Sequence, residues 1–68
     1  MQTSTDVSLA DQIERVGRAL TAEELAAVLN VSSKLIFKKA KAGRLPSFRI
    51  GSCVRFDPHS VAAWLRKQ

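Results

Sequence analysis

Cationic side chains recur at regular spacings in the second half of the chain. Three lysines are separated by four and three residues (Lys34, Lys38 and Lys41), and Arg49 and Arg55 follow them. On an α-helix, this spacing places the three lysines on one face. Ammonium and guanidinium groups bind phosphate oxygens, and the arginine guanidinium does so through paired hydrogen bonds. These residues therefore indicate binding of a polyanion rather than covalent chemistry.

The charge is divided unevenly between the two halves of the chain. The 68 residues carry a net charge of +5, from 11 Lys and Arg against 6 Asp and Glu. Residues 1–30 hold five acidic and two basic side chains, whereas residues 31–68 hold nine basic and one acidic. This division predicts one face that meets an anionic partner, and nucleic acid is the first candidate. The alternative is an ordinary solvated surface of lysines.

Several classes of function are disfavoured by size and composition. A chain of 68 residues forms one small domain, without room for an enclosed substrate cavity. The single histidine, His59, and the single cysteine, Cys53, can complete neither a zinc site nor a catalytic triad. No apolar run reaches the roughly 18 residues of a membrane span. We expect a non-enzymatic protein with no cofactor, metal, small-molecule substrate or membrane partner.

The first 30 residues predict a tail and two short helices. Residues 1–7 are polar and without periodicity, which predicts a flexible N-terminal tail, and residues 8–68 form a single domain. A helix begins after Ser8 and ends near Gly17. Its apolar positions, at a spacing of four and three, are Leu9, Ile13 and Val16.

The second helix has a strong start signal. Thr21 and Glu24 form a capping box, in which each side chain binds the other residue's backbone amide. Asn30 tolerates the left-handed conformation and ends this helix. We expect Val31, the next residue, to be buried.

A basic helix is predicted over residues 33–42, between the N-cap Ser32 and Gly43. Its inward face contains Ile36 and Ala40, and the three lysines lie on its outward face. Two short helices joined by a tight turn, the second of them basic, predict a helix-turn-helix.

Two alternating segments, residues 47–50 and 54–56, predict a β-hairpin. A loop of three residues, 51–53, pairs Ile50 with Val54 and Phe48 with Phe56. We prefer it to the two-residue loop 51–52 because it turns these four apolar side chains toward the core. Arg49 then faces Arg55, and a bound phosphate would relieve their repulsion. The alternative is that the two side chains extend separately into water.

The last helix begins at Asp57, an N-cap that is followed by Pro58 at the first helical position. Its core face contains Val61, Trp64 and Leu65. The whole chain is thus predicted as an α+β fold, with helices and a two-stranded hairpin.

Much of the chain, residues 19–66, resembles the excisionase family of winged helix-turn-helix domains, which is of the MerR-like class. The segments that carry the resemblance are Leu20-Thr21-Ala22-Glu23-Glu24-Leu25-Ala26, Leu29-Asn30-Val31-Ser32, Ile36-Phe37-Lys38, Gly43-Arg44-Leu45-Pro46, Arg49-Ile50-Gly51, Val54-Arg55-Phe56 and Ala63-Trp64-Leu65. The resemblance implies a small winged helix-turn-helix fold in which the hairpin is the wing.

The resemblance also implies which residues contact double-stranded DNA. On the recognition helix, in the major groove, they are Ser33, Lys34, Phe37, Lys38 and Lys41; on the wing they are Arg49, Ser52 and Arg55. For Phe37 two interpretations stay open: it packs beneath the wing, or it meets a thymine methyl group or a sugar.

The function implied by the resemblance is that of an excisionase, a recombination directionality factor. Its further partners would be an integrase or more copies of the same chain on DNA. The resemblance further implies a bacterial or phage-encoded protein that is located in the bacterial cytoplasm and associated with the nucleoid. The closest alternative is a small transcriptional regulator that binds DNA in the same way. Two others are an adaptor that docks proteins through Leu9, Ile13 and Val16, and an RNA-binding protein.

Overall fold

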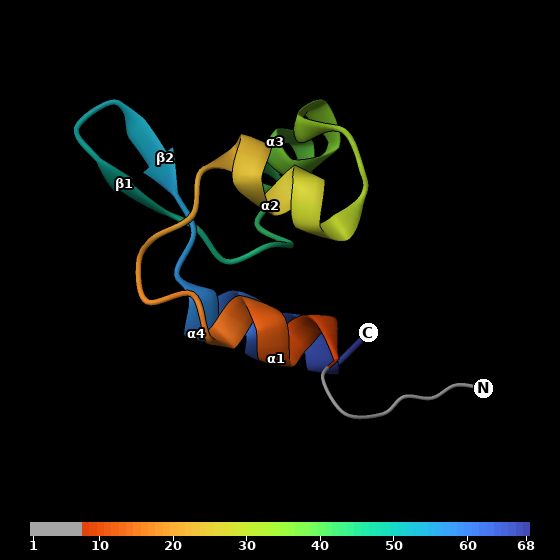
Figure 1. Ribbon diagram of the computed structural model, residues 1–68. Helices are drawn as coiled ribbons and strands as arrows, with labels where there is room; N and C mark the ends of the chain where they lie inside the picture. The colour runs from red at the N-terminus through yellow and green to blue at the C-terminus, as the bar shows by residue number, and fades with distance from the viewer. Residues whose placement is uncertain (1–7) are drawn as a thin grey trace.

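A computed structural model describes residues 8–68, which form four helices and a two-stranded antiparallel sheet (Figure 1). The elements in chain order are α1 (Leu9–Glu14), α2 (Ala22–Leu29), α3 (Ser33–Lys41), β1 (Phe48–Ile50), β2 (Cys53–Arg55) and α4 (Pro58–Arg66). The predicted fold class, α+β with a hairpin, is confirmed. The tail predicted over residues 1–7 lies outside the described residues. The first helix is shorter than predicted, because it ends at Glu14 and not near Gly17.

The helices form two pairs, and the hairpin extends from one side (Figure 1). Helix α1 packs along α4, and α2 packs against α3. The largest fully buried side chains are Ile13, Leu25, Phe56 and Val61, which come from α1, α2, the end of the hairpin and α4. The backbone of Phe56 is tied to Leu20 by two hydrogen bonds of 2.9 Å. One core therefore joins the helix pairs to the base of the hairpin.

Both predicted signals of α2 are confirmed. The Thr21 hydroxyl accepts a hydrogen bond from the Glu24 amide at 3.0 Å, and the Glu24 carboxylate accepts one from the Thr21 amide at 2.9 Å. Asn30 ends the helix in the left-handed conformation, with φ of 59°. The Arg18 guanidinium also donates to both carboxylate oxygens of Glu24. Glu24 thus joins the segment before α2 to its first turn.

We expect the capping box to make stability depend on pH. The bonds from Arg18 and the Thr21 amide lower the pKa of Glu24 from 4.5 to about 2. A carboxyl group whose pKa is lowered by folding stabilises the fold above its unfolded pKa, and this contribution is lost as the pH falls toward the folded value. The free energy of unfolding measured with urea should therefore decrease as the pH is lowered from 4.5 to about 2, and Glu24→Gln should flatten that dependence. An unchanged pH profile in the variant would contradict the assignment.

The predicted register of the hairpin is wrong. The structure pairs Phe48 with Arg55, Arg49 with Val54, and Ile50 with Cys53, around the two-residue loop 51–52. Gly51 has a φ of +61°, as the first central residue of a type II′ turn requires, and such turns match the twist of paired strands. Arg49 and Arg55 are therefore not opposite each other, and their repulsion gives no argument for a phosphate.

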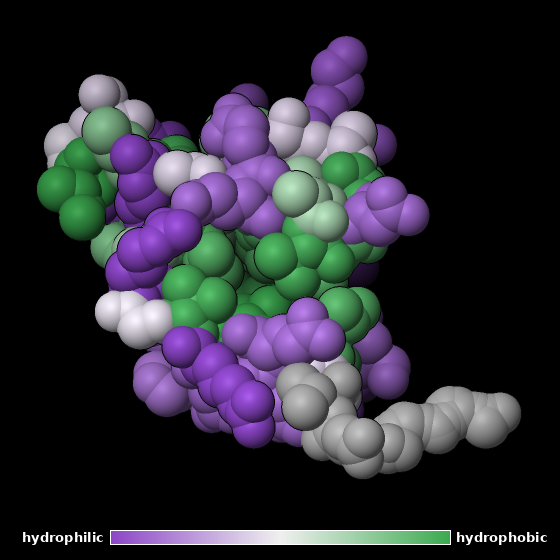
Figure 2. All heavy atoms as spheres, in the orientation of Figure 1, coloured by the Kyte–Doolittle hydropathy of each residue, from purple (hydrophilic) through white to green (hydrophobic). Residues whose placement is uncertain are grey.

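Three predictions of burial are also wrong. Phe48 and Ile50 are 39% and 63% exposed, because the hairpin extends beyond the core and only Phe56, at its base, is fully buried. Figure 2 shows hydrophobic atoms at the outer end of the hairpin. Val31, which follows the left-handed Asn30, is 39% exposed. On α1, Leu9 is 45% exposed, whereas Ala10 and Ile13 are buried.

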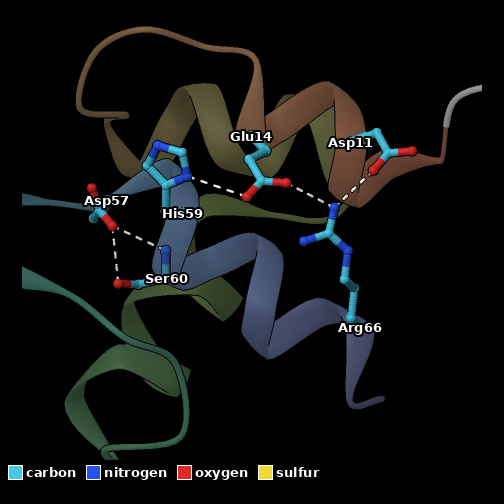
Figure 3. Close-up of polar contacts among 6 residues, drawn as sticks. All are labelled: Asp11, Glu14, Asp57, His59, Ser60 and Arg66. Atoms are coloured by element: carbon cyan, nitrogen blue, oxygen red, sulfur yellow. Dashed lines mark hydrogen bonds and ion pairs between the residues drawn. The ribbon is translucent and has the colours of Figure 1, made fainter.

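Helices α1 and α4 are also joined by polar contacts that the sequence did not predict (Figure 3). Arg66 donates hydrogen bonds to Asp11 at 2.7 Å and to Glu14 at 2.8 Å. His59, exposed as predicted, lies with its Nδ1 3.2 Å from Glu14. These contacts lie along the exposed edge of the interface between α1 and α4, and the buried part of that interface contains Ile13. The adaptor interpretation is weakened, because Ile13 is already buried in the core.

Candidate nucleic-acid interface

Helix α3 presents a basic surface because only one of its sides faces the core. The Ser32 hydroxyl accepts a hydrogen bond from the Leu35 amide at 3.1 Å and caps the first turn. Ile36 is the buried residue of the helix, and Ala40, one turn later, is half-buried. The predicted lysines on the outward side, Lys34, Lys38 and Lys41, are all exposed.

A groove of about 430 Å³ separates α3 from the hairpin. The residues that line it are Phe37, Ala40 and Lys41 from the helix, and Ser47, Arg49 and Val54 from the hairpin and the residue before it. Ala40 and Val54 are half-buried, whereas Lys41 and Arg49 are exposed. The groove thus combines an apolar surface with a cation from each side.

The cations near this groove have no carboxylate partners in the described part of the chain. Residues 25–56 contain seven basic side chains and no acidic one. Between residues 8 and 68, ion pairs involve only Arg18, His59 and Arg66 among the basic residues. The acids of α1, Asp11 and Glu14, are paired with Arg66 and His59 instead, and the hydrogen bonds from Arg66 lower the pKa of both carboxyl groups. The basic residues of α3 and the hairpin are therefore left without carboxylate partners among residues 8–68.

Comparison with protein families supplies the identification. Residues 19–68 match the family described as "Helix-turn-helix domain". The chain belongs to this family of excisionase-like small DNA-binding domains. No curated protein and no solved structure gave a significant match to the chain. For this helix-turn-helix domain, α2 and α3 are the paired helices, and the hairpin is the wing.

The structure brings together some of the predicted contact residues of the helix-turn-helix domain. Phe37, Lys41 and Arg49 line the same groove. Lys34 and Lys38 continue the exposed surface of α3, and Ser52 is exposed in the turn of the hairpin.

Two of the predicted residues are placed differently. Ser33 is half-buried at the first position of α3. Arg55 pairs with Phe48 and lies on the face of the hairpin opposite Arg49, because neighbouring residues of a strand point to opposite faces. It is half-buried and donates a 2.8 Å hydrogen bond to the Val54 carbonyl. Arg55 is therefore separated from the groove that Arg49 lines.

Sequence reasoning missed three residues of the groove: Ala40, Ser47 and Val54. Ala40 and Val54 were both predicted to face the core, and both do pack against it while their remaining surface lines the groove. The signal that finds Val54 is the Gly51-Ser52 turn, because a two-residue loop places Val54 directly across from Arg49.

Within residues 8–68, no three His, Cys, Asp or Glu side chains are grouped so that they could hold a metal ion. In the same range, no helix is long and apolar enough to cross a membrane. These two findings add no site beyond the groove.

Proposed function

We propose that this helix-turn-helix domain binds double-stranded DNA with α3 in the major groove and the hairpin along the sugar–phosphate backbone. The observation that supports this proposal most is the groove, in which Lys41 and Arg49 face a common space from two different elements. The width of the major groove of B-form DNA, about 12 Å, accepts an α-helix. A strand that passes between α3 and the hairpin would meet both cations.

Binding would be driven mainly by charge. Each phosphate that a lysine or arginine neutralises releases condensed counterions, which favours binding at low salt. The exposed lysines of α3 give modest base selectivity, because lysine lacks the paired hydrogen bonds that arginine makes to guanine. One copy of so small a domain also buries a limited area on DNA. We propose that the protein prefers some sequences and gains affinity from neighbouring copies or an integrase.

The biological role that we propose is that of an excisionase, which directs recombination toward excision. A transcriptional regulator with the same mode of binding is the alternative. Membership of a family of excisionase-like domains supports the first role. Gel-shift analysis with circularly permuted DNA distinguishes the two: cooperative binding of several copies with a bend is expected for an excisionase. Binding of one copy without a bend would favour the regulator.

DNA binding itself is tested by a salt titration. If three to five phosphates are contacted, the logarithm of the binding constant should fall with the logarithm of salt concentration with a slope of roughly −3 to −5. Fluorescence anisotropy with a labelled duplex measures this slope, and single-stranded RNA serves as competitor. RNA that competes as well as duplex DNA, or an affinity that does not change with salt, would contradict the proposal. Against the RNA alternative, the chain has no tyrosine, and the exposed aromatic side chains Phe37 and Phe48 do not line a common groove on which successive bases could stack.

A further inference from the structure

We propose that Phe37, Ala40 and Val54 form an apolar site for the 5-methyl group of a thymine, and that Phe37 determines part of the sequence preference. The proposal rests on the proposed DNA binding and adds to it the chemical group that the groove recognises. It chooses between the interpretations of Phe37 that the sequence left open.

The position of Phe37 on α3 makes it available to a ligand. An α-helix turns by about 100° per residue, so Phe37 lies between the buried side of α3 and its lysine surface. Its side chain is 43% exposed. Phe37 is also absent from the hydrophobic core cluster of the fold. A large aromatic ring is thus left partly in water beside Lys41, in the groove that both residues line.

The surroundings of Phe37 select an apolar group. The half-buried side chains of Ala40 and Val54 line the same groove, so the ring continues an apolar surface. The major-groove edges of the base pairs present hydrogen-bonding groups and a single kind of apolar group, the methyl of thymine. Because α3 is the helix proposed to enter the major groove of DNA, the thymine methyl is the apolar group that Phe37 can reach.

The two cations of the groove also favour a thymine methyl next to Phe37. Lys41 on α3 and Arg49 on β1 line the groove together with this apolar surface. A backbone phosphate bound by either of them would hold its nucleotide next to the ring. The charges would then supply affinity, and the apolar surface would distinguish thymine from cytosine and from uracil.

Replacing thymine by deoxyuridine tests this inference, because the exchange removes only the methyl group. The probe is a duplex that the protein selects from a random-sequence library, with each thymine replaced in turn. For the natural protein we expect a loss of about fourfold in affinity at one or two positions, the effect of one buried methyl-sized group. For Phe37→Ala, the thymine and deoxyuridine duplexes should bind equally at those positions.

Two further variants control the experiment. Leu35→Ala removes an apolar side chain of similar exposure, 38%, from α3. Leu35 does not line the groove, so this variant should keep the preference for the methyl group. Phe37→Leu preserves an apolar contact and should keep part of the preference, which maintains the test if Phe37→Ala does not fold. Circular dichroism checks the fold of each variant.

The failure of this inference can be separated from the failure of the proposed function. If the natural protein binds duplex DNA in a salt-dependent way but no deoxyuridine position lowers its affinity, DNA binding stands and the methyl site is overturned. If Phe37→Ala keeps the same deoxyuridine sensitivity, another residue contacts the methyl group and the inference is also overturned. Absence of any binding to duplex DNA would overturn both.

Discussion

Reversing the charges of Lys41 and Arg49 together, by Lys41→Glu and Arg49→Glu, is expected to lower the affinity for duplex DNA at least about a hundredfold. Hydrogen bonds to charged groups contribute roughly 1.5–3 kcal/mol each, so the loss of two contacts accounts for an effect of this size. Both side chains are exposed, so the fold should survive. The slope of the salt titration should also become shallower by about two units, one for each lost phosphate contact. Fluorescence anisotropy at several salt concentrations measures both quantities.

A matched control is the pair Lys39→Glu and Lys67→Glu, which changes the net charge by the same amount. Lys39 lies about 160° around α3 from Lys41, and Lys67 follows α4, at the end away from the hairpin (Figure 1). Neither residue lines the groove. This control should lose much less affinity. Equal losses for the two pairs would show that net charge alone drives binding and that the groove has no special role.

Arg55→Glu separates the two faces of the hairpin. Because Arg55 lies on the face opposite Arg49, we expect its reversal to weaken binding less than Arg49→Glu does. The comparison uses the same residue type on adjacent strands and the same anisotropy assay. A larger loss for Arg55→Glu would place the bound DNA on the other face of the hairpin.

Local signals were enough to predict the helices. The capping box of Thr21 and Glu24, the left-handed Asn30 and the Asp57-Pro58 start each depend on backbone groups within a few residues. The types and chain positions of these residues therefore determine the helix ends almost without help from the rest of the fold. The end of α1 was less well predicted, since no strong stop signal follows Glu14.

The hairpin could not be predicted in the same way, because its register depends on what it packs against. The prediction assumed that Phe48 and Ile50 are buried, and this assumption selected a three-residue loop. In the structure the hairpin extends beyond the core, so burial does not constrain these residues. The turn then sets the register, and Gly51 at positive φ suits a two-residue loop.

Only part of the candidate site was predicted, because some of its residues are placed by local periodicity and others by tertiary packing. Lys34, Lys38 and Lys41 share one exposed side of a helix, and helical periodicity alone places them there. The grouping of Phe37, Val54 and Arg49 requires α3 and the hairpin to approach each other. That approach depends on tertiary packing at Phe56 and Leu20, which no local pattern in the sequence encodes.

Phe56→Ala is expected to lower the free energy of unfolding by about 3–5 kcal/mol, whereas Phe48→Ala should change it by less than about 1 kcal/mol. Phe56 is 0% exposed and Phe48 is 39% exposed, although the sequence predicted both in the core. Truncating a buried phenylalanine costs about 3–5 kcal/mol. Stability of roughly 0.05–0.15 kcal/mol per residue gives a domain of this size only about 3–10 kcal/mol in total. Urea unfolding followed by circular dichroism compares the two variants.

The reason for so large a difference is that Phe56 joins parts of the fold that are distant in sequence. Its side chain belongs to the core cluster with Ile13 and Val61, and its backbone pairs with Leu20. Truncating its side chain would leave a cavity in this core cluster, next to the base of the hairpin. DNA binding should then weaken in Phe56→Ala in proportion to the unfolded fraction but persist in Phe48→Ala, since Phe48 does not line the groove. Comparable destabilisation by the two substitutions would mean that the hairpin packs on the core along its whole length, with the register that the sequence suggested.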